Sequence, residues 1–242
     1  MRLLRHRRLV AATSGGGSAF SPASIAGLQL WLDASQITGL NDGDAVGTWA
    51  DLSGNGNDAT QATGSKKPTF ETNELNGRPV VRFDGVDDIL QTPIFGQFPS
   101  KRGTLFLVYK ATFGASYKSV LNTITGAGVG FQLEMVKSGV KYKWYDGVAD
   151  GLAAVFDPAG FDLQTINRTG DTAMDFRRNG TLEVVFTVTN NQPDARVMDV
   201  GASALGSYAS GDMALLLMYD GSLSAGDVSL VESWINARYL LF

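Results

Sequence analysis

The 242-residue sequence predicts an all-β protein, built as an antiparallel two-sheet sandwich with one short helix at the C-terminal end. Two observations support this prediction. Short apolar segments with period-two alternation recur along the chain, and clusters of Gly, Asn, Asp or Pro bound most of them, as is typical of strands. The composition agrees, because 29 glycines and 44% hydrophobic residues favour a folded, turn-rich protein over a disordered one.

Nine segments are expected to contain strands, and the turn between two of them is well defined. In residues 174–186 (MDFRRNGTLEVVF), Asn179 and Gly180 separate two apolar runs, and both residues tolerate the positive φ angles of a type I′ turn. This pattern predicts a β-hairpin. The expected strands lie within residues 28–34, 79–83, 104–111, 129–135, 141–147, 161–167, 174–180, 181–188 and 212–221.

One helix is expected, over Ala225–Arg238. Ser224 is placed to cap the backbone amide of Asp227, which is a common start of a helix. Apolar residues then recur at helical spacing: Val228, Val231, Trp234 and Ile235. Many short strands followed by one helix, without an internal repeat of fixed period, indicate a sandwich rather than a propeller or a solenoid.

The first 24 residues differ from the rest and are predicted to form a basic arm with a Gly/Ser linker, ahead of one domain over residues 25–242. Four arginines lie within the first eight positions, at Arg2, Arg5, Arg7 and Arg8. Residues 13–22 (TSGGGSAFSP) have the composition of a flexible linker. Because such an arm cannot bury a core, we expect it to order only against an acidic groove of a larger assembly; the alternative is a solvated tail.

Charge, hydropathy and cysteine content exclude several classes of partner. The formal net charge of -4 argues against nucleic acid, which requires clustered Lys and Arg on the domain. The apolar run after the arginines (LVAAT) is shorter than the core of a signal peptide, and no run approaches the length of a membrane span, so we expect neither. The chain has no cysteine, which fits assembly in a reducing cytoplasm.

Four motifs, in this order, resemble those of a known family: residues 27–35 (GLQLWLDAS), 49–61 (WADLSGNGNDATQ), 75–88 (LNGRPVVRFDGVDD) and 219–239 (YDGSLSAGDVSLVESWINARY). They are similar to the concanavalin A-like, laminin G-like jelly-roll domains of bacterial surface proteins and bacteriophage virion proteins. The resemblance covers about residues 25–242. It implies a jelly-roll sandwich whose first and last strands lie close together, and a domain that binds glycans or proteins, sometimes through calcium.

The Gly- and Asn-rich loop at residues 51–58 (DLSGNGND) has two readings. Its glycines and short polar side chains can form a tight turn without any ligand, which is the favoured interpretation. In the functional reading, Asn55 and Asn57, with the flanking aspartates, offer polar groups to a sugar or oxygen ligands to a cation.

A second acidic stretch, residues 83–88 (FDGVDD), places Asp84, Asp87 and Asp88 close together. Calcium prefers several such oxygen ligands, so these three residues are the weak candidates for a calcium site. No EF-hand spacing accompanies them, and a solvated acidic turn is the favoured interpretation. No other cofactor is expected.

The residue inventory leads us to expect no enzymatic activity. The only histidine is His6, in the arm, so the domain cannot use Ser-His-Asp chemistry or histidine-ligated zinc. Glycoside hydrolysis needs only two carboxylates, but the closely spaced E-x-D-x-x-E pattern of the hydrolytic relatives of the resembling family does not occur. Neither Glu134 nor Glu232 has an obvious catalytic partner in the sequence.

Aromatic residues in residues 141–147 (KYKWYDG) are the candidate sugar platforms, because a ring face packs against the C–H face of a pyranose. Trp144 and Tyr145 are the glycan-binding candidates. In a strand, successive residues point to opposite faces, so at least one of the two is expected in the core, and Trp144 is the favoured one.

The leading hypothesis is a non-catalytic structural protein of a phage virion, a head decoration or a tail-associated protein. Its arm would bind other virion proteins, and its lectin-like domain would bind host or environmental glycans or partner proteins. We expect an oligomer within a virion assembled in the host cytoplasm. The alternatives are a bacterial surface or secreted carbohydrate-binding module and a degenerate glycoside hydrolase.

Overall fold

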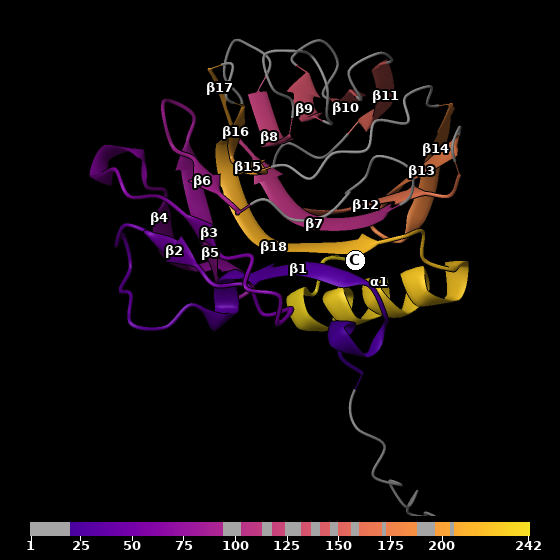
Figure 1. The fold of residues 1–242 in the computed structure, drawn as a ribbon, viewed down its shortest axis with the longest axis horizontal. Helices are drawn as coiled ribbons and strands as arrows, with labels where there is room; N and C mark the ends of the chain where they lie inside the picture. The colour runs from indigo at the N-terminus through magenta and orange to yellow at the C-terminus, as the bar shows by residue number, and fades with distance from the viewer. Residues whose placement is uncertain are drawn as a thin grey trace, which may run out of the picture.

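The computed structural model describes residues 20–93, 103–112, 118–123, 132–136, 141–145, 150–155, 160–170, 173–187, 197–203 and 206–242. These residues form two antiparallel sheets that pack face to face, with helix α1 (Ala225–Tyr239) against the outer face of one sheet. Figure 1 shows this sheet, here called the helix-side sheet, as a curved layer between α1 and the second sheet, here called the opposite sheet. The predicted antiparallel two-sheet sandwich with one C-terminal helix is confirmed.

The helix-side sheet has eight strands in the order β14-β13-β12-β7-β18-β5-β4, and β1 pairs with β18 beside this path. Its strands are β1 (Leu28–Asp33), β4 (Thr69–Leu75), β5 (Arg78–Asp84), β7 (Gly103–Ala111), β12 (Asp162–Arg168), β13 (Ala173–Arg178), β14 (Thr181–Thr187) and β18 (Ser210–Asp220). The pairing of β1 with β18 brings together the first and last long strands, as the resemblance implies.

The opposite sheet also has eight strands, in the order β11-β10-β9-β8-β15-β6-β3-β2. They are β2 (Thr48–Trp49), β3 (Ala59–Thr60), β6 (Leu90–Gln91), β8 (Lys118–Asn122), β9 (Gln132–Val136), β10 (Lys141–Tyr145), β11 (Asp150–Val155) and β15 (Asp199–Val200). A small hairpin and three 3-10 turns complete the described elements: β16 (Ala202–Ser203), β17 (Ser207–Tyr208), η1 (Pro22–Ser24), η2 (Ala34–Gln36) and η3 (Gly64–Lys66).

Strand β7 contributes side chains to two hydrophobic clusters, one on each face of the helix-side sheet. Its residues alternate between the faces of the sheet, so Leu105 and Leu107 join the cluster between the sheets, whereas Phe106 and Val108 join the cluster under α1. All four side chains are fully buried. Because both faces of β7 are covered, the strand is a nearly continuous apolar run in sequence.

Helix α1 begins and packs as its sequence predicts. Ser224 Oγ accepts a hydrogen bond from the amide of Asp227 at 3.1 Å, and Val228, Val231 and Ile235 are buried against the helix-side sheet. Trp234, also part of the predicted face, is half-buried and meets Trp31 edge to face at 5.7 Å. The helix ends at Tyr239, one residue beyond the predicted end.

The predicted hairpin is present between β13 and β14. Asn179 and Gly180 have φ angles of 48° and 76°, as a two-residue type I′ turn requires. The arm lies outside the described residues, and the division of the chain at residue 25 stays a prediction. Packed contacts begin before that boundary, because Phe20 contacts the cluster under α1 and Tyr219 donates to the carbonyl of Pro22 at 3.0 Å.

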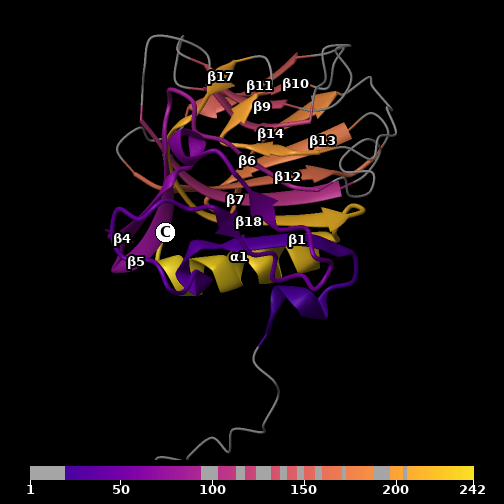
Figure 2. The same cartoon turned by 60° about the vertical axis from the view of Figure 1, so that its left-hand side comes forward.

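Seen from a second direction, the layers keep the same arrangement. Figure 2 shows α1 beneath β1 and β18, with the opposite sheet on the far side. No helix in the described part of the chain combines the length and the apolar character that a membrane crossing needs.

Candidate functional site

The loop at residues 51–58 is held by its own side chains. Asp51 accepts hydrogen bonds from the amides of Trp31 (2.9 Å), Ser53 (2.9 Å) and Asn57 (3.0 Å), and Asp58 accepts one from the amide of Asp51 (2.8 Å). Gly54 and Gly56 supply the positive φ angles of the turn. The loop therefore has a complete structural explanation that involves no ligand.

Asn55 and Asn57, the candidate sugar-binding residues of this loop, direct their amide groups to strand β1. Asn55 Nδ2 donates to the carbonyl of Leu28 at 2.9 Å, and Asn57 Nδ2 donates to that of Gln29 at 2.8 Å. These bonds cover the free edge of β1, a common protection of edge strands. The amide donors of both residues are thus already used, which weakens the case for a sugar site here.

The acidic turn after β5 brings its three carboxylates together. One oxygen from each of Asp84, Asp87 and Asp88 lies within 4.8 Å of the others. Two of these side chains also bond the backbone of the turn, because Asp88 Oδ2 accepts from the amide of Asp84 and Asp84 Oδ1 from that of Val86, both at 2.8 Å. The arrangement could hold a hard cation. The hydrogen bonds from the turn amides to these carboxylates also account for it without any ion, so the calcium site stays a prediction.

Asp88 is the most perturbed carboxyl group of this turn. The pKa of Asp88 is raised to about 6, mainly by burial and also by the nearby carboxylates of Asp84 and Asp87, while the hydrogen bond from the amide of Asp84 opposes the shift. The turn was expected to be solvated; Asp84 and Val86 are exposed and Asp87 is half-buried, but Asp88 is only 5% exposed.

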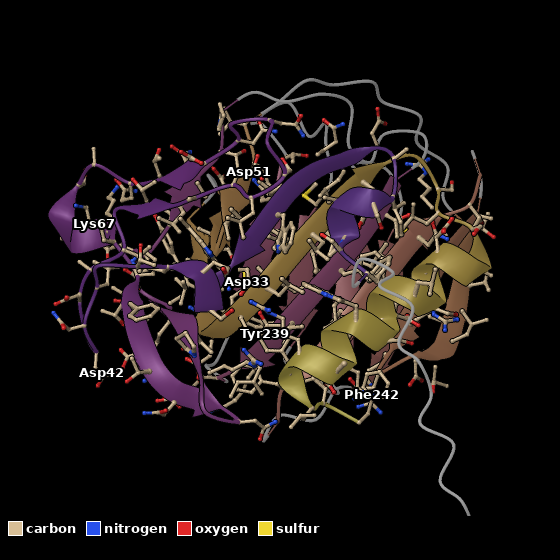
Figure 3. The ribbon with its side chains drawn as sticks, turned by 90° about the horizontal axis from the view of Figure 1, so that it is seen from below. Asp33, Asp42, Asp51, Lys67, Tyr239 and Phe242 are labelled. Carbon is tan, nitrogen blue, oxygen red and sulfur yellow. The ribbon has the colours of Figure 1, made fainter. Side chains whose placement is uncertain are left out.

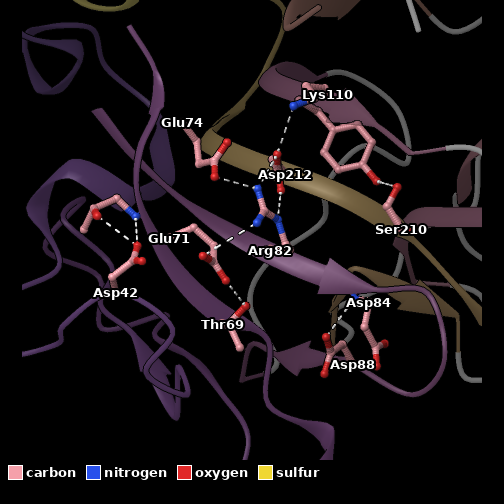
Figure 4. A network of polar contacts seen from close by, with 12 residues as sticks. Asp42, Thr69, Glu71, Glu74, Arg82, Asp84, Asp88, Lys110, Ser210 and Asp212 are labelled. Carbon is pink, nitrogen blue, oxygen red and sulfur yellow. Dashed lines mark hydrogen bonds and ion pairs between the residues drawn. The ribbon is translucent and has the colours of Figure 1, made fainter. Parts of the chain in front are cut away.

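A charged network lies beside this turn on the outer face of the helix-side sheet. Figure 4 shows the guanidinium group of Arg82 between three carboxylates. It lies 2.6 Å from Asp212, 3.1 Å from Glu74 and 3.6 Å from Glu71, and Lys110 lies 3.4 Å from Asp212. Asp212 is buried, so Arg82 and Lys110 compensate a charge that would otherwise be costly.

A hollow of about 370 Å³ lies between this network and the acidic turn.

No local sequence pattern indicates this network, because its residues are far apart along the chain. Asp212 lies in an apolar run, and Arg82 is one residue of a predicted strand. Only the antiparallel pairing of β18 with β5, which places Asp212 opposite Arg82, brings them together. The network is satisfied internally and needs no ligand.

A row of polar residues crosses the opposite sheet. Residues that are directly paired in neighbouring strands share one face of a sheet. The register pairs eight residues in succession, one from each strand: Thr48, Thr60, Gln91, Asp199, Asn122, Gln132, Tyr145 and Asp150. This set is here called the polar row. It runs through all eight strands, from β2 to β11.

Hydrogen bonds connect the centre of the polar row. Asp199 accepts from Gln91 Nε2 at 2.8 Å and from Asn122 Nδ2 at 3.2 Å. Asp199 and Asn122 are buried, whereas Gln91, Thr60 and Thr48 are exposed. The accessible described part of the row therefore lies at the end formed by β2, β3 and β6.

The neighbouring row contains apolar residues and faces the core. The register pairs Leu90 with Val200, Val200 with Leu121, Leu121 with Leu133, and Leu133 with Trp144. The first four belong to the cluster between the sheets. The backbone thus places Trp144 in a core row and Tyr145 in the polar row, although both side chains lie outside what the structure describes.

The arm residues Arg2, Arg5, Arg7 and Arg8 also lie outside the described residues. Sequence reasoning missed Gln91, Asn122 and Asp199, because each belongs to a short strand whose alternation is too brief to detect. The polar row depends on register between strands far apart in the sequence, which period-two patterns do not specify.

No protein-family model and no curated protein matches the chain. Solved structures do match its fold. Trypanosoma rangeli sialidase has a TM-score of 0.63 at 14% identity, over 86% of this chain and 33% of the sialidase. The botulinum neurotoxin serotype D binding domain has a TM-score of 0.62 at 12% identity, over 86% of this chain and 52% of that domain. The HCR/D F1240A mutant has a TM-score of 0.64 at 11% identity, over 86% of this chain and 51% of the mutant's chain.

This chain therefore spans about a third of the sialidase and about half of the binding domain. At these identities the likeness shows the fold, an all-β sandwich, and no more. It corrects one expectation, that the protein is not an enzyme, because the proteins that share this fold include sialidases, which are enzymes. The residue inventory was too narrow a criterion, since some glycosidases use a tyrosine nucleophile in place of the usual carboxylate pair.

Proposed function

We propose that the chain is a concanavalin A-like, lectin-like domain that binds carbohydrate along the polar row of the opposite sheet. One observation carries the proposal: the register aligns polar residues from all eight strands, and Tyr145, a candidate sugar platform, belongs to that row. The structural neighbours add limited support, because one of them is a sialidase in complex with sialic acid.

The spacing of the row suits an extended glycan. Neighbouring strands lie about 4.8 Å apart, so a row across a sheet presents one polar side chain at each such interval. A glycan chain likewise presents hydroxyl groups at regular intervals, and each hydroxyl can both donate and accept. The exposed amide of Gln91 and the exposed hydroxyls of Thr60 and Thr48 can therefore pair with successive sugar units.

Retention on immobilised polysaccharides tests this function. The full chain should be retarded by at least one polysaccharide of a panel in affinity electrophoresis, and Tyr145→Ala should weaken binding about tenfold, since aromatic contacts contribute roughly 1 kcal/mol or more. Gln91→Ala should also weaken binding, because Gln91 is exposed in the row. Tyr208→Ala, at a half-buried tyrosine of β17 outside the row, is the control. Equal retention of all four proteins, or no retention on any polysaccharide, would contradict the proposal.

The biological setting is also proposed. We infer that the domain belongs to a phage virion, as a head decoration or tail-associated protein, and that its arm binds other virion proteins. The support is the four arginines of the arm and the Gly/Ser stretch that separates them from the domain. Deletion of residues 1–17 should leave the melting temperature unchanged and abolish incorporation into particles. Normal incorporation of the truncated protein would contradict this role of the arm.

A further inference from the structure

The sequence contains three Asn-Gly pairs: Asn55-Gly56, Asn76-Gly77 and Asn179-Gly180. An asparagine before glycine is prone to deamidation, because glycine has no side chain to obstruct the attack of its backbone nitrogen on the asparagine side chain. All three glycines have positive φ angles and lie in turns. The contacts around the three asparagines differ, and these contacts decide which side chain is free to react.

Asn179 is fixed at both ends of its side-chain amide. Its Oδ1 accepts from the backbone amide of Leu163 at 2.9 Å, and its Nδ2 donates to Asp162 Oδ1 at 3.0 Å. The turn is also covered, because a Cβ added at Gly180 would lie 3.2 Å from the ring of Phe242. The side chain must break these contacts before it can turn towards the backbone nitrogen of Gly180.

Asn55 is held by its nitrogen inside a cross-linked loop. Its Nδ2 donates to the carbonyl of Leu28 at 2.9 Å and to Ser53 Oγ at 3.0 Å, and its backbone amide donates to the same hydroxyl at 3.2 Å. The carboxylate of Asp51 fixes the loop on both sides, through the amides of Ser53 and Asn57. The backbone beside Asn55 is therefore tied down before and after the pair.

Asn76 lies in the exposed turn between β4 and β5, and this turn is the most open of the three. The φ angles are 49° at Asn76 and 82° at Gly77, and a Cβ added at Gly77 would meet nothing within 4 Å. One residue pair, Leu75 with Arg78, closes the turn, and the register is irregular from there back to Glu71. Local opening of a turn closed by one pair costs less free energy than opening of a regular ladder.

The side chain of Asn76 holds the end of α1. Its Nδ2 donates to the carbonyl of Tyr239 at 2.7 Å and to that of Leu240 at 3.1 Å, and Arg78 Nε donates to the carbonyl of Arg238. The last carbonyls of a helix have no partner within the helix itself. Figure 3 shows Tyr239 at this end of α1. The turn between β4 and β5 thus secures the last turn of the helix.

We propose that Asn76 deamidates spontaneously and that the product releases the last turn of α1. The backbone nitrogen of Gly77 attacks Cγ of Asn76 and loses its proton, the new C–N bond closes a succinimide ring, and the Cγ–Nδ2 bond breaks to release ammonia. Water then opens the ring to aspartate or isoaspartate, so the net reaction is hydrolysis of one amide. This inference is independent of the proposed function, because α1 packs on the helix-side sheet and the polar row belongs to the opposite sheet.

The product cannot make the contacts of the amide. An ionised carboxylate only accepts hydrogen bonds, so the oxygen that replaces Nδ2 faces the carbonyl oxygens of Tyr239 and Leu240 without a hydrogen between them. The new negative charge also lies at the C-terminal end of α1, where the helix dipole is negative. Isoaspartate in addition lengthens the backbone of the turn, which no longer suits a two-residue connection.

Peptide mass spectrometry of the full chain, sampled during incubation at mildly alkaline pH, tests the reaction. We expect Asn76 to convert about tenfold faster than Asn179 or more, because a modest difference in local opening free energy gives such a ratio. Asn73 is the internal control, since it is exposed and has a φ of 60° but precedes Glu74, and it should remain an amide. Asn76→Gln should abolish the conversion at this position, because glutamine must close a larger ring.

Two results of that measurement would overturn the reaction at Asn76. One is conversion of Asn179 at the same rate as Asn76 or faster. The other is an Asn76 that remains an amide in the folded chain while the denatured chain converts under the same conditions.

Hydrogen exchange of the backbone amides tests the release of the helix. Asn76→Asp supplies the aspartate product directly. Asn73→Asp adds the same charge at an exposed position three residues away, where the side chain makes no hydrogen bond within the described residues. We expect the amides of the last turn of α1 to exchange about tenfold faster in Asn76→Asp, because two hydrogen bonds are lost, and to be unchanged in Asn73→Asp. Equal exchange in the two variants would show that Asn76 does not hold the helix and would overturn the proposal.

Discussion

Tyr239, in the last turn of α1, donates its phenolic hydrogen to the buried carboxylate of Asp33 at 2.9 Å, across 206 residues of sequence. Arg238 pairs with the same carboxylate, at 2.9 Å. Two successive helix residues thus hold the end of β1, so the attachment of α1 depends on a contact between the two ends of the domain. Burial and the nearby Asp33 charge raise the pKa of Tyr239, so the hydroxyl stays a donor at every ordinary pH.

Tyr239→Phe should lower the free energy of unfolding by about 1.5–3 kcal/mol, because hydrogen bonds to charged groups contribute in that range. Denaturant unfolding measures it. The control is Tyr208→Phe, at a half-buried tyrosine of β17, which should change stability by less than about 0.5 kcal/mol. Equal effects of the two substitutions would show that the Asp33 contact contributes little.

Glu232 provides a second test of how α1 is attached. Its buried carboxylate pairs in a bidentate manner with Arg177, at 2.8 and 3.0 Å, and joins the helix to the β13–β14 hairpin. Glu232→Gln should destabilise the fold by about 3 kcal/mol, the range for breaking a buried ion pair. Glu183→Gln removes a more exposed pair with Arg178 at 3.4 Å and should cost below about 1 kcal/mol in the same unfolding assay.

The backbone offers a matched pair of glycines with left-handed φ angles. At Gly201, an added Cβ would lie 2.1 Å from the ring of Phe83, which is fully buried, whereas at Gly54 it would meet nothing within 4 Å. Gly54→Ala should cost about 1–2 kcal/mol for its φ of +89° alone. Gly201→Ala adds overpacking of the core and should cost roughly 3 kcal/mol or more. A similar loss for both variants would mean that the core around Phe83 adapts easily.

Local features of the fold could be predicted from the sequence because short-range chemistry decides them. The Ser224 cap, the Asn179-Gly180 turn and the apolar face of α1 each depend on a few neighbouring residues. All nine expected strands are present, since each has enough alternation or apolar content to be recognised. Two-residue strands such as β3, β6 and β15 are too short to show any period.

The candidate site depends on pairing between distant strands, which no local pattern encodes. Asp199 lies beside Gln91 and Asn122 only because the two residues of β15 insert between β6 and β8. A shift of one residue in that register would move Asp199 into the core and Val200 out of it. The alternation within β10 did separate Trp144 from Tyr145, and the register then assigned each of them to a row.

The last prediction concerns the pH dependence that Asp88 introduces. Its pKa is about 6 in the folded protein against an ordinary value of 3.8 for an aspartate side chain, so the folded state holds this proton more tightly than the unfolded state. The resulting stability is fully present below pH 3.8. As the pH rises, the unfolded state loses its proton first, and this stability is lost until the folded state also ionises near pH 6.

Asp88→Asn removes this titration and keeps an oxygen that can accept from the amide of Asp84. The variant should therefore gain stability relative to the natural protein between pH 4 and pH 7, by up to roughly 3 kcal/mol for a shift of about two pKa units. Unfolding curves of both proteins across this range measure the difference, which cancels the titration of carboxyl groups that do not interact with Asp88. Asp220→Asn, at the exposed end of β18, measures what the same substitution does at the surface. A difference for Asp88→Asn that stays constant across this range would show that Asp88 is solvated in solution and that its carboxylate ionises as in a free peptide.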